Sequence, residues 1–174
     1  MRPGRPSRHS CLPRSRAANR PFGRAAADVD ARRRGCSARR VYLLDTNVVS
    51  ELRKLRPHAA VREWLQAADE RTLFLSAVTL GEIQAGIEIT REQDAAKAGA
   101  LEAWVEQLAG AYNILPMDAA TFREWARLMH RQSDTVYEDA MIAATARRHH
   151  LTVVTRNTRD FVRFQVELLN PFKG

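Results

Sequence analysis

The stretch Val41-Tyr42-Leu43-Leu44-Asp45-Thr46-Asn47-Val48-Val49 decides the fold of this chain. It opens with four apolar residues in a row, which is typical of a strand that is buried on both faces of a parallel sheet. The three polar residues that follow can cap a helix, and the two valines begin that helix. The chain thus passes directly from a buried strand into a helix, as in α/β proteins.

Further apolar runs have the length of short strands, at residues 72–76, 114–116, 151–154 and, as a candidate, 166–169. Segments with helical periodicity separate these runs. We expect helices around residues 48–52 and 61–65, interrupted by Pro57, and around 80–87, 91–109, 118–130 and 139–149. This alternation predicts an α/β protein, a three-layer α/β/α domain with a central, mostly parallel sheet of four to five strands.

The net charge of +8 is unevenly distributed. Residues 1–40 contain 12 Arg and 2 Asp, whereas residues 41–174 contain 16 basic and 18 acidic side chains. We therefore expect a disordered basic leader at 1–40 and a folded domain at 41–174. The leader could be a transit peptide or a basic arm that touches RNA. We favour a third hypothesis, that the native protein begins at Val41 through an alternative start codon; an intact mass that includes residues 1–40 would contradict it.

Composition narrows the class of protein. A chain of 174 residues with 45% hydrophobic content is long enough for one globular domain. No apolar run approaches the ~18 residues of a membrane span, so we expect no membrane association. The two cysteines, Cys11 and Cys36, are too few for a disulfide framework. We therefore expect a reducing compartment, the cytoplasm.

Four acidic residues from distant segments are expected at one edge of the sheet. Asp45 ends the first strand, Glu82 follows the second strand, and Asp139 and Asp160 flank the fourth. Sites of open parallel sheets form at the carboxyl ends of the strands. Carboxylates gathered there repel one another and persist ionised only around a cation. Oxygen ligands without Cys or His favour Mg²⁺ or Mn²⁺, which can activate a water for attack on a phosphoryl group.

Each acid also has a purely structural interpretation when it is taken alone. Asp45 could be a helix cap, and Glu82 could form a capping box with Thr79. Asp139 could complement the dipole of its helix, and Asp160 could be a solvated loop acid. Spacing alone therefore leaves the functional and the structural interpretations open.

The sequences around these acids resemble the motifs of PIN-domain nucleases, especially the VapC-type toxins of bacterial toxin–antitoxin pairs. The motifs are LLDTNVVS at 43–50, SAVTLGEIQAGI at 76–87, EDAMIAATA at 138–146 and VTRNTRDF at 154–161, with LNPF at 169–172 as the ending. They occur in order over about three-quarters of the chain. The third motif selects Asp139 over its neighbour Glu138, between which spacing does not decide.

The resemblance implies a Mg²⁺-dependent endoribonuclease. It assigns Asp45 and Asp139 as the principal metal ligands and lets Glu82 complete the cluster, directly or through a water. Asp160 would bind a second ion or position the nucleophile. Because many relatives have an acid where this chain has Asn157, the fourth role is open between Asn157 and Asp160.

Four neighbouring residues receive auxiliary roles. Thr46 and Thr155 fit positions that orient carboxylates, or they are simply turn hydroxyls. Arg156 and Arg159 could steady the RNA backbone, or they could form local ion pairs with the acids.

The resemblance also implies partners: an RNA substrate, a small antitoxin protein that threads a segment across the site, and a second copy of the chain in a homodimer. An apolar stripe after Asp45 is the expected docking surface for the antitoxin, with core packing as the alternative; it consists of Leu52, Val61, Trp64 and Leu65. We interpret His149 and His150 as structural and Trp104 and Trp125 as core residues.

Three rival functions remain. The first is a non-catalytic RNA-binding or regulatory domain on the same scaffold, which a Mg²⁺-dependent cleavage assay distinguishes. The second is phosphoryl transfer with Asp45 as the nucleophile, which needs a nearby lysine. The third is DNA binding through the basic leader, which removal of residues 1–40 would abolish.

Overall fold

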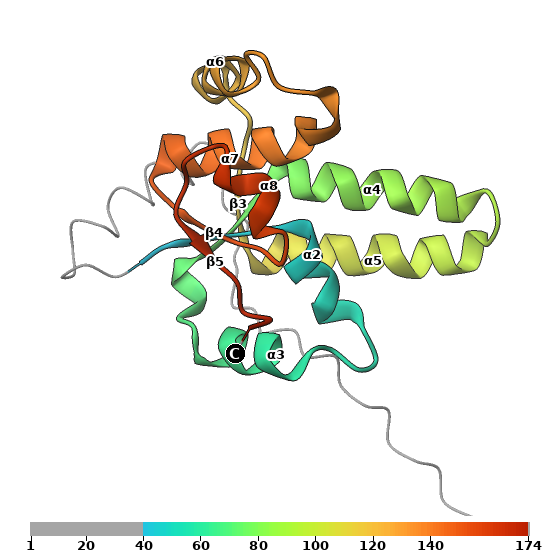
Figure 1. Cartoon of the computed structure of the whole chain (residues 1–174). Coiled ribbons are helices and arrows are strands. Elements are labelled where there is room, and N and C mark those ends of the chain that lie inside the picture. The colour runs from blue at the N-terminus through green and yellow to red at the C-terminus, as the bar shows by residue number, and fades with distance from the viewer. Residues whose placement is uncertain (1–39, 174) are drawn as a thin grey trace, which may run out of the picture.

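The computed structural model of the chain describes residues 40–173 (Figure 1). The predictions for the leader therefore lie outside the described residues, apart from its exposed last residue, Arg40.

Five parallel strands form the central sheet, in the order β3-β2-β1-β4-β5. The strands are β1 (Tyr42–Leu44), β2 (Leu73–Ser76), β3 (Asn113–Leu115), β4 (Thr152–Val154) and β5 (Leu168–Leu169). Every apolar run that the sequence predicts as a strand overlaps one, and the candidate run at 166–169 supplies β5. The prediction of a mostly parallel sheet with four to five strands is confirmed.

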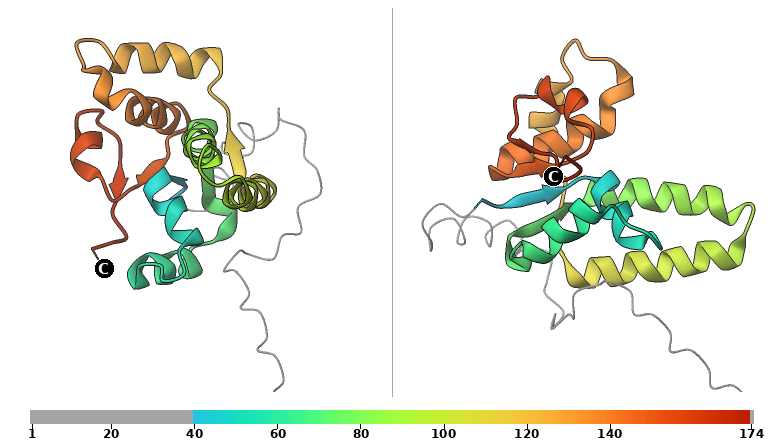
Figure 2. Two further views of the ribbon diagram at one scale, coloured as in Figure 1. Left: turned by 90° about the vertical axis from the view of Figure 1, so that its right-hand side faces the viewer. Right: turned by 60° about the horizontal axis from the view of Figure 1, so that its bottom comes forward.

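Helices connect these strands. They are α2 (Thr46–Val49), α3 (Ala59–Ala67), α4 (Ala77–Arg91), α5 (Ala95–Ala111), α6 (Ala119–Leu128), α7 (Tyr137–His149) and α8 (Thr158–Val162). Three 3₁₀ turns join them, η2 (Ser50–Arg53), η3 (Glu70–Thr72) and η4 (Asp134–Val136). In Figure 2, α4 and α5 run side by side and project beyond the sheet.

Two helices differ from the sequence-based expectation. The helix predicted over 91–109 begins only at Ala95, because the Asp94 carboxylate caps a new helix by accepting from the Lys97 N–H (2.9 Å). The pattern also predicts no helix between the apolar runs at 151–154 and 166–169, whereas the chain forms α8 there. This helix is too short for apolar periodicity to reveal it, and the fully buried Phe161 anchors it to the core.

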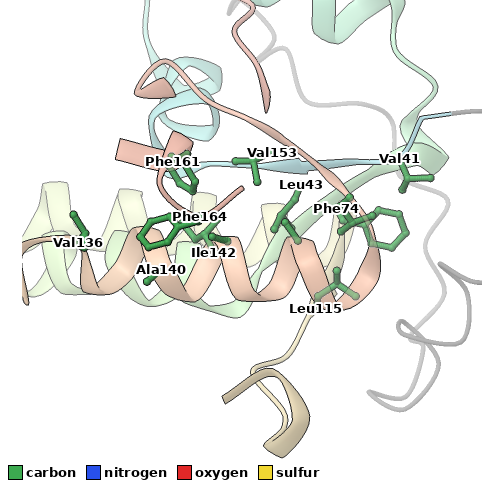
Figure 3. Packing of buried hydrophobic residues seen from close by; sticks show 13 residues of the cluster. Val41, Leu43, Phe74, Leu115, Val136, Ala140, Ile142, Val153, Phe161 and Phe164 are labelled. Atoms are coloured by element: carbon green, nitrogen blue, oxygen red, sulfur yellow. The ribbon is translucent and has the colours of Figure 1, made fainter. Parts of the chain in front are cut away.

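The side chains of successive residues in a strand point to opposite faces of the sheet. Leu43 packs in a cluster with Ile142 of α7 and Phe161 of α8 (Figure 3). Leu44, its neighbour, packs in a second cluster with Val48 of α2 and Leu108 of α5. Helices therefore cover both faces, and the three-layer prediction is confirmed.

Helix α7 lies close against the sheet because its buried side is built from small residues. Ala140, Ala143, Ala144 and Ala146 are all fully buried. His150 ends the helix in a left-handed conformation (φ 54°) and leads the chain into β4. Since α7 returns the chain to the start of β4, its first turn lies at the carboxyl edge of the sheet.

Trp104 and Trp125 are half-buried and pack against the core clusters, as predicted. None of the helices within residues 40–173 combines the length and the apolar character that crossing a membrane requires.

Candidate acidic active site

The chain changes direction across the sheet at β1, which lies between β2 and β4. From β1 it proceeds outward to β2 and β3, and then it crosses over to build β4 and β5 on the other side. Such a switch point opens a crevice at the carboxyl ends of the two central strands. Asp45 follows β1 and Thr155 follows β4, so their side chains meet there.

Asp45 is buried at this switch point, with 5% of its surface exposed. One carboxylate oxygen accepts from the Thr46 N–H (2.7 Å), so Asp45 does cap α2. The other oxygen accepts from the Thr155 hydroxyl (2.6 Å) and from the Asn47 amide. Burial raises the pKa of Asp45, and these hydrogen bonds offset only part of the increase. The cap interpretation is therefore correct but incomplete.

Glu82 is tied to the same edge by the turn after β1. The Thr46 hydroxyl donates to a Glu82 carboxylate oxygen (2.5 Å) and so links α2 to α4. The capping-box interpretation with Thr79 is wrong, because α4 begins at Ala77 and the Ser76 hydroxyl caps it. Burial raises the pKa of Glu82, the Thr46 bond opposes this increase, and the charges of Asp45 and Glu138 add to it.

Asp139 lies half-buried in the first turn of α7, whereas its neighbour Glu138 is exposed. Burial and, in decreasing order, the charges of Asp45, Asp160, Glu82 and Glu138 raise the pKa of Asp139 from 3.8 to about 6. The positive end of the helix dipole would lower this pKa. Burial and repulsion by the other acids therefore act against the dipole at this position.

Asp160 lies on α8, so the loop-acid interpretation is wrong. Its carboxylate accepts a hydrogen bond from the Asn157 amide and lies 3.8 Å from a guanidinium nitrogen of Arg163. Asn157 and Asp160, which the sequence presents as alternatives, are thus one hydrogen-bonded pair beside Asp139.

Sequence reasoning missed the part that Asn47 plays. Its amide nitrogen donates to Asp45 and to the Thr155 hydroxyl (3.0 Å), and its carbonyl oxygen accepts from the Arg156 N–H (3.0 Å). Asn47 therefore ties the turn after β1 to the turn after β4. Its place directly after Asp45 and Thr46 is the only sequence signal of this role, and helix capping already explains that signal.

The donors at this edge suit a hard divalent cation. Asp45, Glu82 and Asp139 offer only carboxylate oxygens, and none of them forms an ion pair with a described Lys or Arg. Within residues 40–173, however, no three acidic, His or Cys side chains are drawn together closely enough to enclose a metal ion. Asp45 is turned toward Thr155, and Glu82 is turned toward Thr46. The oxygen ligands at this edge are of the type that Mg²⁺ and Mn²⁺ prefer. In this structure, protein hydrogen-bond donors hold the carboxylates of Asp45 and Glu82.

Comparison with known families adds an independent observation. The family model of the PIN domain matches residues 42–167, a span that includes all four acids. The chain belongs to the PIN domain family. Within this PIN domain, the first and last matched residues coincide with the beginning of β1 and the approach to β5.

The match to named relatives of this PIN domain spans almost their whole length. It is 36% identical to VapC ribonuclease Y4jK of Sinorhizobium fredii over 76% of this chain and 99% of that protein. It is 34% identical to toxin FitB of Neisseria gonorrhoeae, again over 76% of this chain and 99% of that protein.

Two solved structures also match this PIN domain. The crystal structure of FitAcB from Neisseria gonorrhoeae matches with a TM-score of 0.66 and 32% identity, over 76% of this chain and 99% of that one. A toxin–antitoxin complex from Klebsiella pneumoniae matches with a TM-score of 0.53 and 25% identity, over 75% of this chain and 97% of that one. The PIN fold expected from the motifs is therefore shown.

The arginines of the fourth motif in this PIN domain face solvent. Arg156 lies over the ring of Phe172, with 5.6 Å between the guanidinium carbon and the ring centroid. Neither Arg156 nor Arg159 forms an ion pair with an acid of the described residues. The arginine that approaches the acids is Arg163, three residues after Asp160, which sequence reasoning missed although its spacing is that of a helical pair.

Proposed function

We propose that this PIN domain is a metal-dependent endoribonuclease that acts as the toxin of a toxin–antitoxin pair. The observation that carries the proposal is the convergence of Asp45, Glu82 and Asp160 on Asp139 at the switch point of the sheet, where their charges help to raise the pKa of Asp139. Groups that repel one another in a half-buried site persist when a ligand of opposite charge stabilises them. Relatives named as ribonuclease and toxin support the assignment.

In this proposal Asp45 and Asp139 hold Mg²⁺ or Mn²⁺, and Glu82 completes the cluster. The bound ion supplies a Lewis acid that polarises a phosphoryl oxygen and lowers the pKa of a water. The hydrogen-bonded pair of Asn157 and Asp160 lies beside Asp139 and would orient the attacking water or hold a second ion.

The protein donors around the acids fix their orientation. Thr155 and Asn47 hold one oxygen of Asp45, and the Thr46 hydroxyl holds Glu82. Partners of this kind keep ligands in the geometry that a metal needs. Loss of the Thr155 hydroxyl would therefore reduce metal affinity without removing a ligand.

RNA is the proposed substrate, because exposed arginines lie directly beside the acids. Arg156 and Arg159 belong to the turn and first residues of α8, next to Thr155 and Asp160. With no described acid to neutralise them, they are available to contact phosphates. Phosphoryl transfer through Asp45 receives no comparable support, because Lys54 instead binds Glu51 away from the acids.

A small antitoxin is the proposed protein partner, and an apolar groove between η2 and α3 is its proposed docking surface. The groove has a volume of about 340 Å³ and is lined by Leu52, Val61, Leu65 and Tyr112, among others. Val61 is fully buried in the core, whereas Leu52 and Leu65 remain partly exposed. Core packing therefore applies to Val61, and we propose antitoxin docking for Leu52 and Leu65. We expect Leu65→Asp to weaken inhibition by a co-expressed antitoxin while RNA cleavage by the toxin alone persists.

We also propose that the domain forms a homodimer through the outer face of α6. Phe122 and Tyr137 expose 44% and 38% of their surface, and both pack edge-on against Trp125. Exposed aromatic clusters of this kind mark contact surfaces. Sedimentation should give a dimer for the full chain and a monomer for Phe122→Ser; a monomer for both would refute this part of the proposal.

The test of the catalytic proposal is RNA cleavage by the purified full chain with and without Mg²⁺. We expect endonucleolytic products in Mg²⁺, none in excess chelator, and none from Asp45→Asn in either condition. Unchanged cleavage by Asp45→Asn would refute the mechanism. RNA binding without any cleavage would support the non-catalytic alternative instead.

A further inference from the structure

A second charged feature lies at the end of α7 opposite to Asp139. There, residues of α6 and of the end of α7 line a groove of about 460 Å³. Figure 1 shows the positions of these two helices. Four arginines, one acid and one histidine line it: Arg123, Arg127, Arg147, Arg148, Glu124 and His150. We call this feature the arginine groove. Its charged side chains are mostly positive, whereas residues 41–174 as a whole contain 16 basic and 18 acidic side chains.

Acids of the described domain neutralise only part of this charge. Arg127 and Arg147 share Glu124, at 2.9 and 3.0 Å. Arg123 and Arg148 are exposed, and neither forms an ion pair with a residue between 40 and 173. They are therefore available to an external anion.

Asp118, the acid that precedes α6, is already held by hydrogen bonds within the protein. Two hydrogen bonds from Thr121, at 2.8 and 2.7 Å, hold the Asp118 carboxylate. These bonds lower the pKa of Asp118, and Arg148 contributes a smaller part of the decrease without forming an ion pair.

Helix dipoles explain only part of this arrangement. Arg127, Arg147 and Arg148 lie in the last turns of their helices, where cations are stabilising. Arg123 lies in the middle of α6, where the dipole offers no such benefit. Like charges that converge on one groove repel each other. Stability alone therefore does not account for the placement of Arg123 opposite Arg148.

Contacts along α8 connect the arginine groove to the acids. Asp160 lies 3.8 Å from Arg163, and the next residue, Phe164, accepts a hydrogen bond through its carbonyl from Arg147 (3.3 Å). The exposed Arg156 and Arg159 lie at the beginning of the same path. A band of basic side chains therefore runs from the acidic site over α8 to the groove.

We infer that the arginine groove binds phosphates of the RNA strand that flanks the cleaved bond, so that the enzyme prefers RNA that extends well beyond the site. The inference rests on the proposed ribonuclease function and names its substrate class. Asp139 and Arg147 lie on one helix, about 12 Å apart along its axis. A stacked strand covers this distance with about four nucleotides, at about 3.4 Å each. A shorter RNA would fill the acidic site and fail to reach the groove.

The test compares the double variant Arg123→Glu/Arg148→Glu with the control Arg56→Glu/Lys97→Glu in the full chain. The control changes the charge equally at exposed positions on other elements, and the basic leader is the same in both. The substrates are a single-stranded RNA of about 20 nucleotides that the enzyme cuts and the fragment of about four nucleotides around its cut site. Binding of the long RNA is measured in an Asp139→Asn background as a function of salt.

For the groove variant, we expect the KM for the long RNA to rise about tenfold or more, with kcat unchanged and cleavage of the short RNA unaltered. Its affinity for the long RNA should fall similarly, and the slope of log affinity against log salt should decrease by about two. The control should match the parent in every measurement.

Three results would overturn the inference while leaving the ribonuclease proposal intact. They are equal losses on the long and the short RNA, equal losses in the groove variant and the control, and a larger loss of affinity for duplex DNA of the same length. Absence of cleavage by the parent protein would instead refute the proposed function, and the inference with it.

Discussion

Two regions of this domain bury carboxylates, but the charged neighbours of these carboxylates have opposite signs in the two regions. Glu51, in the turn between α2 and α3, is 4% exposed and receives hydrogen bonds from the Lys54 ammonium (2.5 Å) and the His58 N–H (2.9 Å). Burial alone would raise its pKa, but these two partners outweigh burial and lower it. Asp139, at the acidic edge, has other acids as its charged neighbours, and its pKa is raised to about 6.

The difference separates a structural acid from a candidate ligand. The chain supplies its own cation to Glu51, so ionisation of that side chain stabilises the fold. Residues 40–173 supply none to Asp139, so ionisation there opposes folding until a cation binds. Burial of a carboxylate is therefore uninformative until the sign of its charged neighbours is known.

The largest expected difference between the two regions appears when one negative charge is removed from each. Asp139→Asn should reduce RNA cleavage by at least about 100-fold, because it removes a proposed metal ligand. Glu51→Gln, which makes the same chemical change, should retain nearly all cleavage per folded molecule. Single-turnover rates at saturating RNA measure both, and equal losses would remove the distinction between the two acids.

Stability should respond in the reverse order. Glu51→Ala should lower the free energy of unfolding by about 2 kcal/mol, because it leaves the His58 N–H and the Lys54 ammonium without their partner. Asp139→Asn should leave stability unchanged or raise it at neutral pH without metal. Urea denaturation, with Arg56→Ala as a surface control, checks this expectation.

The pH dependence of stability should have opposite signs in the two regions. The folded-state pKa of Asp139 lies above its ordinary value of 3.8, so its stabilising contribution is complete below that pH and is lost as the pH rises through about 6. Glu51 has a lowered pKa, so its contribution is present above its ordinary value of 4.5 and is lost as the pH falls.

The opposite signs can be measured as the difference in the free energy of unfolding between the parent and each variant at each pH. As the pH rises from 4 to 7, the free energy of unfolding of the parent should fall by about 1–2 kcal/mol relative to that of Asp139→Asn. This figure allows for solvent screening of a half-buried group. Relative to Glu51→Gln, the parent should gain stability over the lower part of that range. Denaturation in chelator across this range measures both differences, and curves of the same sign would contradict the comparison.

The smallest expected effect is that of metal itself. At a free Mg²⁺ concentration about tenfold above its Kd, the parent should gain about 1.4 kcal/mol of stability. Asp45→Asn and Asp139→Asn should gain none, whereas Glu51→Gln should gain as much as the parent. Thermal denaturation with and without MgCl₂ measures these gains in stability, with CaCl₂ and NaCl at matched ionic strength as controls.

Much of the architecture could be predicted from the sequence because its signals are local. The apolar runs at 41–44 and 151–154 each contain a strand, and the four motifs place their acids beside the strand ends. The break before α5 and the existence of α8 escaped prediction, because a single capping aspartate and one buried phenylalanine decide them. The capping box at Thr79 was a false local signal that the true cap, Ser76, displaces.

Contacts between distant segments could not be predicted in the same way. Nothing in the order of residues indicates that Asn47 bonds to Thr155 or that Arg123 and Arg148 share a groove. These facts depend on which helix packs against which face of the sheet.

By itself, the sequence determined an α/β domain with a strand-to-helix turn at Asp45 and acids at the junctions of its elements, because periodicity and capping act over a few neighbouring residues. Only the tertiary structure decided which carboxylates repel one another, which receive a cation from the chain, and where unpaired arginines gather. Burial and electrostatic interactions depend on distance in space, and the packing of separate elements sets that distance.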